Sequence, residues 1–318
     1  MTLLGYLTLA YGDIKPLADC YDNIRRYVDY IDRNYPSGLT TFGRGDWVPV
    51  SRPSDKELTS SVYYYVDARI LARAARILGH EADSRHYGAL ADKIRNAING
   101  KFLDRERGIY ASGTQTELAV PLKWGIVPEE LRPQVAAGLN RLVEEADYHI
   151  DCGVLGAKAL LDALTLNGYA YTAWRVASQT TYPSWGHWIV NGATTLHENW
   201  DMQATRDISD NHMMFGEIGA WFYKGLAGIY PDEDRPGFEH VLLRPNFPSG
   251  LNRFNADFRS PYGLIQVGWQ RKGNKVECRI TLPANSSATF TVPAGMRLRS
   301  GDSVLHLTSG THVLRLVE

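Results

Sequence analysis

The sequence is poor in cysteine, has no excess of either charge and contains no long hydrophobic run. Its three cysteines, Cys20, Cys152 and Cys278, are widely spaced and odd in number, which indicates neither a disulfide framework nor a zinc-binding pattern. The 34 basic and 35 acidic residues leave a net charge of -1, so nothing favours a nucleic-acid partner. No stretch approaches the roughly 20 consecutive apolar residues of a membrane span, and we expect no membrane association. The apolar first ten residues lack the basic start and cleavage site of a signal peptide, which leaves both cytoplasm and periplasm open.

Aromatic residues, in contrast, are abundant: the 318 residues include 8 Trp and 18 Tyr. Sugar rings offer apolar C–H faces that stack on such side chains and hydroxyls that hydrogen-bond beside them, although protein cores use aromatic residues too. The 44% hydrophobic and 22% charged content is that of an ordinary globular chain and excludes disordered and collagen-like classes. Composition alone therefore permits a carbohydrate site without establishing one.

The hydrophobic period changes near residue 237, which predicts two domains, 1–236 and 237–318. The first has helical periodicity, with eight or nine helices and no strands expected between about residues 3 and 230. One predicted helix face carries Leu17, Tyr21, Ile24, Val28 and Ile31, another carries Tyr87, Leu90, Ala91, Ile94 and Ile98, and a late one carries Phe215, Ile218, Phe222, Leu226 and Ile229.

The second domain alternates apolar and polar residues with a period of two, as in Ile265, Val267 and Trp269 or in Val276, Cys278, Ile280 and Leu282. Turn signals recur at hairpin spacing, so we predict an antiparallel β-sandwich of seven or eight short strands. Trp269 fits either its core or its surface.

The helical domain shows no repeat of the about 34 to 45 residues that solenoids use. Its long aromatic segments, 34–56, 108–117, 144–154 and 180–212, instead favour an α/α toroid whose loops form a cleft at one end.

The densest group of polar and aromatic residues surrounds Glu198, between His197 and the pair Trp200 and Asp201. A carboxylate there can act as a general base on water, with Trp200 among the aromatic walls that would hold a sugar. The alternative is a solvated loop glutamate. Inverting hydrolysis of a glycoside needs a second carboxyl group roughly 6.5–9.5 Å away. The candidates for this acid are Asp46, Asp201, Asp210 and Glu217.

Two more segments suit sugar binding. Asp46, in a Gly-x-Gly turn, can bind sugar hydroxyls while Trp47 stacks on the ring, or it can be an ordinary turn residue. His212 can hydrogen-bond a substrate hydroxyl, or it can belong to a helix start capped by Ser209, Asp210 or Asn211. No nucleophile-elbow, P-loop, dinucleotide or zinc-protease motif is present, and the histidine spacings match no metal site, so we expect no cofactor and no metal.

In their order along the chain, nine short motifs resemble those of bacterial α-L-rhamnosidases, glycoside hydrolase family 78. They are Tyr11-Gly12-Asp13, Phe42-Gly43-Arg44-Gly45-Asp46-Trp47, Gly113-Thr114-Gln115-Thr116, Cys152-Gly153-Val154-Leu155-Gly156, Tyr182-Pro183-Ser184-Trp185, Gly192-Ala193-Thr194-Thr195, Glu198-Asn199-Trp200-Asp201, Asn211-His212 with Phe215-Gly216, and Arg259-Ser260-Pro261-Tyr262-Gly263.

The resemblance covers essentially the whole chain and implies an (α/α)6 barrel followed by a β-sandwich. It also implies an inverting hydrolase that releases terminal α-L-rhamnose from glycosides or polysaccharides. Glu198 lies where this family has its general base, and Trp47 and His212 lie where it has sugar contacts, with Asp46 beside Trp47.

The sequence departs from the family pattern at one point. The acidic motif that carries the family's general acid precedes its Tyr-Gly-Asp segment, and no equivalent lies between Met1 and Asp13. We therefore expect an incomplete barrel without its proton donor, weakly active or inactive unless a missing segment or a second copy completes it. The alternatives are another inverting toroid glycosidase, a non-catalytic carbohydrate-binding remnant and a structural helical scaffold.

Overall fold

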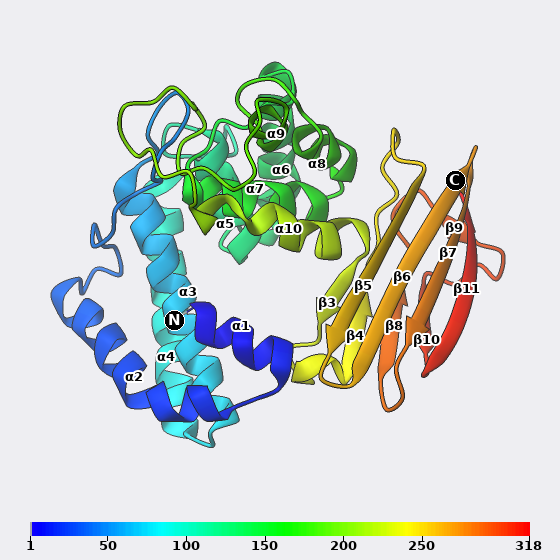
Figure 1. Cartoon of the computed structure of the whole chain (residues 1–318). Coiled ribbons are helices and arrows are strands. Elements are labelled where there is room, and N and C mark those ends of the chain that lie inside the picture. The colour runs from blue at the N-terminus through cyan, green and yellow to red at the C-terminus, as the bar shows by residue number, and fades with distance from the viewer. Residues whose placement is uncertain (1) are drawn as a thin grey trace. The chain divides into compact units, whose positions relative to one another are not determined.

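The computed structural model describes residues 2–318, which divide into two compact units (Figure 1). One unit comprises Cys20–Ile218 and is mainly helical. The other comprises Leu3–Asp19 and Gly219–Glu318 and contains two β-sheets. The division at residue 237 that the sequence indicates stays a prediction. Among the described residues no helix is long and apolar enough to cross a membrane.

Apolar spacing and capping residues account for much of the helical structure. The residues expected on one face of the second helix, including Ile24, Val28 and Ile31, are all buried. Asp55 caps the third helix by accepting from the Leu58 amide, and Thr114 and Glu117 form a capping box at the fifth. The helices are α1 (Thr2–Tyr11), α2 (Lys15–Asn34), α3 (Lys56–Ile77), α4 (Glu81–Phe102), α5 (Gln115–Trp124), α6 (Arg132–Glu145), α7 (Val154–Leu166), α8 (Ala170–Ala177), α9 (Trp185–Val190) and α10 (Glu217–Trp221).

The long segments predicted between helices are mostly loops, although α9 lies within 180–212 and a short hairpin reaches into 108–117. Within 103–110 the strand β1 (Leu103–Asp104) pairs antiparallel with β2 (Ile109–Tyr110), although no strand was expected in the helical part. Asp104 accepts hydrogen bonds from the amides of Glu106, Arg107 and Gly108, and Gly108 has a φ of +66°. This turn brings together two strands that are too short to show an alternating pattern.

The helix predicted over 215–229 is also interrupted. A 3-10 turn at Met213–Phe215 precedes α10, a π-helical turn follows at Phe222–Leu226, and Ile229 already belongs to a strand. Gly228 has a φ of +73°, and a Cβ there would lie 2.1 Å from the Pro245 nitrogen. The close approach of these two segments ends the helical course, which hydrophobic spacing alone does not reveal.

The second unit holds two sheets, of four strands in the order β10-β8-β4-β3 and of five in the order β5-β6-β7-β11-β9. All pairs are antiparallel except β4 with β8, which is parallel. The strands are β3 (Ile229–Pro231), β4 (His240–Leu243), β5 (Arg253–Ser260), β6 (Gly263–Lys272), β7 (Lys275–Leu282), β8 (Ser287–Thr291), β9 (Arg297–Leu298), β10 (Val304–Leu307) and β11 (Gly310–Val317).

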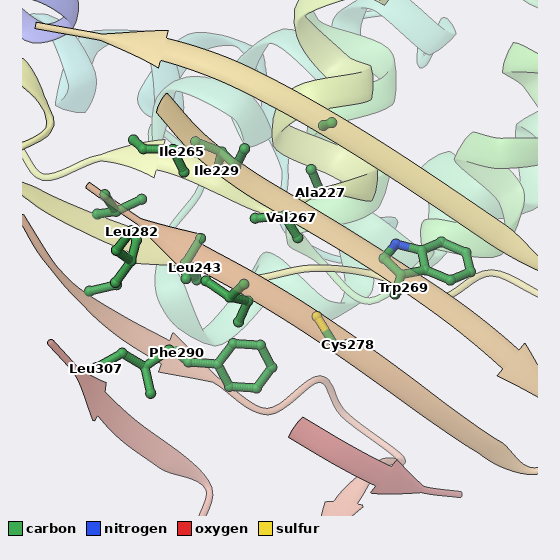
Figure 2. Close-up of a cluster of buried hydrophobic side chains, with 14 of the residues drawn as sticks. Ala227, Ile229, Leu243, Ile265, Val267, Trp269, Cys278, Leu282, Phe290 and Leu307 are labelled. Carbon is green, nitrogen blue, oxygen red and sulfur yellow. The ribbon is translucent and has the colours of Figure 1, made fainter. Parts of the chain in front are cut away.

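Alternate residues of these strands form the core of the second unit (Figure 2). Every apolar residue that the alternation placed on one face of β6 and β7 is buried, and Trp269, left open by the sequence, is a core residue. Its indole nitrogen donates to the Leu226 carbonyl, so its polar atom is satisfied as it is buried. Burying side chains of this size contributes about 1.5–3 kcal/mol each.

Candidate functional site

Three of the predicted site residues line one cavity of about 490 Å³ in the helical unit. Trp47, Glu198 and His212 lie at this cavity, together with Arg44 and Met214. They come from two loops that are more than 100 residues apart in sequence. The structure thus brings together the general-base candidate and two of the candidate sugar contacts.

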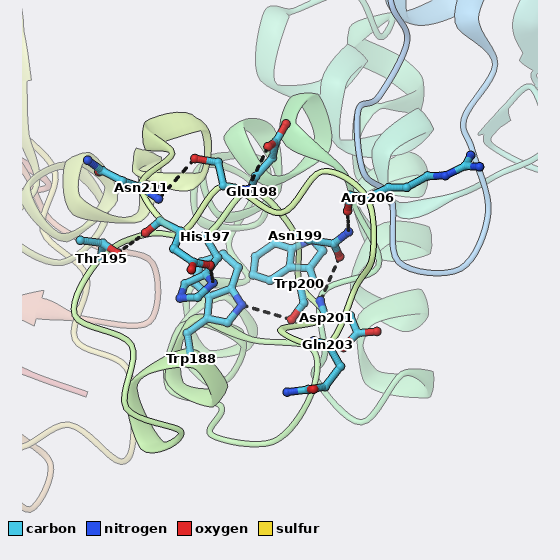
Figure 3. A network of polar contacts seen from close by, with 12 residues as sticks. Trp188, Thr195, His197, Glu198, Asn199, Trp200, Asp201, Gln203, Arg206 and Asn211 are labelled. Carbon is cyan, nitrogen blue, oxygen red and sulfur yellow. Dashed lines mark hydrogen bonds and ion pairs between the residues drawn. The ribbon is translucent and has the colours of Figure 1, made fainter.

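The segment 196–212 folds back on itself, with Glu198 on one arm and Asn211 on the other (Figure 3). The Glu198 amide donates to the Ser209 carbonyl at 2.8 Å, and the His212 amide donates to the Leu196 carbonyl at 2.8 Å. At the tip of the loop, the Asn199 side chain donates to the Arg206 carbonyl. Backbone pairing therefore fixes the spacing of the two side chains, without a regular strand.

The Glu198 carboxylate is held by donors on both of its oxygens. Trp47 Nε1 donates to Oε1 at 3.3 Å, and the Ser209 amide donates to Oε2 at 3.3 Å. The side chain is 18% exposed and lines the cavity. A carboxylate oriented in this way can accept a proton from a water molecule bound in the cavity.

His212 itself caps the 3-10 turn that follows it, whereas the sequence offered Ser209, Asp210 or Asn211 as the cap. Its Nδ1 accepts from the Met214 amide at 3.4 Å, so the ring proton lies on Nε2. Nε2 is 4.0 Å from Glu198 Oε1. His212 can therefore cap the turn through Nδ1 and still offer Nε2 to a substrate hydroxyl, although the sequence posed these two roles as alternatives.

Trp47 lies in a loop whose backbone is tied to the start of α7. Its carbonyl accepts from the Val154 amide at 2.9 Å, and the next residue, Val48, has a φ of +55°. A β-branched residue rarely adopts this left-handed conformation, so the surrounding contacts hold the loop in a strained shape. The Arg44 guanidinium lies 5.9 Å from the centre of the indole ring.

The other two predicted binding residues, Asp46 and Trp200, are not among the residues that line the cavity. Asp46 is 6% exposed, and its carboxylate accepts hydrogen bonds from Thr116 and from the start of α7. Trp200 is 1% exposed and packs between Trp188 and Phe215. Both side chains bind protein groups in the structure, which favours a supporting role over a sugar contact.

The carboxyl groups considered as the second acid lie elsewhere. Asp201 and Asp210 are exposed, and Asp210 pairs with His197 at 3.0 Å. Glu217 lies 3.6 Å from the buried Lys123 ammonium. None of the three lines the cavity.

A carboxyl group that the sequence reasoning missed does line the cavity. Asp67, on α3, is partly buried, and burial raises the pKa of its carboxyl from 3.8 to about 6. In the sequence Asp67 is one of two charged residues, with Arg69, among the apolar positions Val62, Tyr65, Val66 and Ile70, so its charge alone did not mark it. The described residues hold no cluster of three or more His, Cys, Asp or Glu side chains that would bind a metal.

Two consecutive parts of this chain match known protein families. Residues 6–226 match the bacterial alpha-L-rhamnosidase 6 hairpin glycosidase domain, and residues 228–304 match the bacterial alpha-L-rhamnosidase C-terminal domain. The chain belongs to the bacterial α-L-rhamnosidase family. The expected fold class, a six-hairpin toroid domain followed by a β-rich domain, is thereby confirmed.

Individual rhamnosidases are similar over nearly the whole chain. An alpha-L-rhamnosidase of Streptomyces avermitilis is 31% identical over 98% of this chain, which covers 32% of that protein. The structure of alpha-L-rhamnosidase from Dictyoglumus thermophilum has a TM-score of 0.90 at 31% identity and covers all of this chain and 39% of its own. The Streptomyces avermitilis enzyme complexed with L-rhamnose has a TM-score of 0.88 at 30% identity, covering 97% of this chain and 32% of its own. The chain thus spans about a third of the length of these relatives.

Proposed function

We propose that this chain carries the base and sugar-binding half of an inverting α-L-rhamnosidase site. The observation that supports this most directly is the contact of Glu198 with Trp47, beside His212, in one cavity. The rhamnosidase names of its relatives suggest the substrate class, a terminal α-L-rhamnosyl residue on a glycoside or polysaccharide.

In the proposed reaction Glu198 takes a proton from water as the water oxygen forms a bond to the anomeric carbon. The bond from that carbon to the aglycone oxygen breaks on the opposite face, so the configuration inverts. Trp47 and His212 would hold the sugar, with the apolar face of the ring on the indole. The aglycone oxygen leaves with a proton when a general acid supplies one, or as an anion when it is stable enough.

The source of that proton decides how active the chain is. General acid catalysis contributes about 10²–10⁴-fold, so a site without it fails mainly on poor leaving groups. We therefore expect the purified chain to release 2,4-dinitrophenolate from its α-L-rhamnoside far faster than an alkyl alcohol from the corresponding rhamnoside. The dinitrophenolate anion needs no proton in order to leave.

The test compares Glu198→Gln with the exposed control Glu145→Gln. We expect loss of dinitrophenolate release only in the first variant, and loss of L-rhamnose binding by calorimetry in Trp47→Ala but not in Trp174→Ala, on α8 outside the cavity. Binding without turnover of the activated substrate would identify a carbohydrate-binding remnant. Turnover of another aryl glycoside in its place would identify a different glycosidase, and absence of binding would leave a structural scaffold.

We further propose that the proton donor for unactivated substrates comes from polypeptide outside these 318 residues. Next to the cavity, α2 and the following loop expose the aromatic side chains of Tyr27, Tyr30 and Phe42, at 41%, 50% and 52%. Such a cluster of apolar surface is typical of a contact with further protein. Light scattering distinguishes a second copy of this chain, which would double the mass, from a separate segment, which would leave a monomer.

A further inference from the structure

The Asp46 carboxylate is joined to two other segments of the helical unit, α5 and the start of α7. Oδ2 accepts from Thr116 Oγ1 at 2.6 Å and from the Gly153 amide at 2.8 Å. Oδ1 accepts from the Leu155 amide at 2.7 Å and from the Gly156 amide at 3.1 Å. Four donors on one carboxylate that is 6% exposed exceed what an ordinary turn aspartate needs.

These bonds replace a missing helix cap. α7 begins after Gly153, which has no side chain to cap it, and the first amides of a helix have no partner within the helix. Asp46 accepts from the amides of Leu155 and Gly156, and the Trp47 carbonyl accepts from the Val154 amide. A negative charge at this position also interacts favourably with the helix dipole. The loop of residues 46–47 thus caps α7 from outside.

The loop and α5 lie so close to α7 that two positions, the N-cap Gly153 and Gly156 within the helix, have no room for a side chain. A Cβ at Gly153 would lie 2.2 Å from the Trp47 carbonyl oxygen and 2.8 Å from Asp46 Oδ1. A Cβ at Gly156 would lie 2.0 Å from Thr116 Oγ1. A larger residue at Gly153 would push the loop away from the helix, and one at Gly156 would displace Thr116, which binds Asp46.

The same turn also holds the loop of the base. The Cys152 carbonyl accepts from Trp200 Nε1 at 2.8 Å, and Trp200 follows Glu198 by two residues. Asp46 therefore binds a turn that positions Trp47 on one side and the Glu198 segment on the other. The two arms meet again where Trp47 Nε1 donates to Glu198 Oε1.

We propose that Asp46 is a positioning residue, whose carboxylate caps α7 and thereby holds the Trp47 indole against Glu198. The inference rests on the proposed function for its meaning in catalysis, but its geometric part does not. Asp46 touches no sugar in this scheme. It acts through Trp47, whose backbone it fixes through the neighbouring peptide.

Glu117 offers a matched control. It is 1% exposed and accepts from the Asp55 amide, from the Ser112 amide and hydroxyl, and from the Thr114 amide. Asp46→Asn and Glu117→Gln each remove one buried carboxylate with several donors, so both should destabilise the chain. Only the first should affect Trp47. Thr116→Val, which removes one donor and keeps the charge of Asp46, is a milder second variant.

The first measurement is the indole ¹H–¹⁵N signal of Trp47 in the full chain, assigned by its disappearance in Trp47→Phe. We expect it to move in Asp46→Asn and Glu198→Gln, to move less in Thr116→Val, and to stay in place in Glu117→Gln. An unchanged signal in folded Thr116→Val and Asp46→Asn overturns the proposal, as does an equal shift in Glu117→Gln. If Asp46→Asn does not fold, Thr116→Val against Glu117→Gln decides.

The second measurement is L-rhamnose binding and dinitrophenyl rhamnoside turnover. A misplacement of about 1 Å costs on the order of 100-fold in rate, and we expect a loss of that size in kcat for Asp46→Asn with a smaller change in KM. Wild-type turnover that persists in Asp46→Asn overturns the positioning role. If the wild-type chain neither binds nor hydrolyses, the proposed function fails, and the indole signal still decides the geometry of Asp46.

Discussion

The glycine that meets the Asp46–Trp47 loop gives the sharpest test of the packing. In Gly153→Ala the added methyl group would lie 2.2 Å from the Trp47 carbonyl oxygen, which is backbone and cannot rotate away. The loop must therefore move off the start of α7. That movement breaks or lengthens the bonds that the Val154, Leu155 and Gly153 amides make to residues 46 and 47.

The expected magnitude follows from these contacts. Overpacking of this kind costs about 1–3 kcal/mol, and each buried hydrogen bond that is lost adds about 1 kcal/mol. A total destabilisation of roughly 3 kcal/mol is therefore expected. With a urea m-value of about 2–3 kcal/mol/M, the unfolding midpoint falls by about 1 M.

Far-ultraviolet circular dichroism follows this transition, because the helices lie largely in the unit that contains Gly153. Gly88→Ala is the matched control: it lies within α4, and a Cβ there has no atom within 4 Å. It should raise the unfolding free energy by about 0.5–1 kcal/mol through helix propensity. Opposite signs for the two variants support the packing described here. A Gly153→Ala midpoint equal to that of the wild type would refute it.

Two other predictions concern stability. The Lys123 ammonium lies 3.0 Å from the Asp162 carboxylate, and both side chains are less than 10% exposed. Lys123→Met should therefore lower the free energy of unfolding in urea by about 3–5 kcal/mol, because it leaves the buried carboxylate without its cation. The double variant Lys123→Met/Asp162→Leu should recover much of that loss, and a single variant as stable as the wild type would contradict this reasoning. Burial lowers the pKa of His240 below its usual 6.5, and its ring nitrogens bond Ser287 and Thr289. The unfolded chain therefore binds the proton more readily than the folded chain does, so the melting temperature of the β unit should fall as the pH drops through 6.5. The melting temperature should depend less on pH in His240→Gln than in the exposed control His86→Gln.

Periodicity identified the regular elements because burial repeats along them. The face of α2 and the alternating residues of β6 and β7 are buried as predicted. Periodicity missed the strands β1 and β2, which have two residues each and are held together by a turn. It also missed the end of the helix near Gly228. In both places a local close approach decides the structure, and such contacts leave no repeat in the sequence.

The candidate site, like the fold, could be predicted from the sequence only in part. Polar residues in aromatic, glycine-rich loops indicated Trp47, Glu198 and His212, which do meet at the cavity. The side to which each neighbour points was not readable: Glu198 faces the cavity, whereas Trp200 is buried against Trp188. Asp46 has its partners 70 to 110 residues away, so nothing near it in the sequence shows that its carboxylate is occupied.

The hydrogen bonds of Glu198 orient it without exhausting it. A carboxylate offers about four acceptor positions, and Trp47 and Ser209 use one on each oxygen. His212 Nε2, at 4.0 Å, is too distant to occupy a third. Acceptor positions therefore remain for a water molecule on the cavity side, while the donors on both oxygens prevent rotation of the carboxylate. A base needs this combination, a fixed direction and a free lone pair, and a merely solvated glutamate lacks the first of the two.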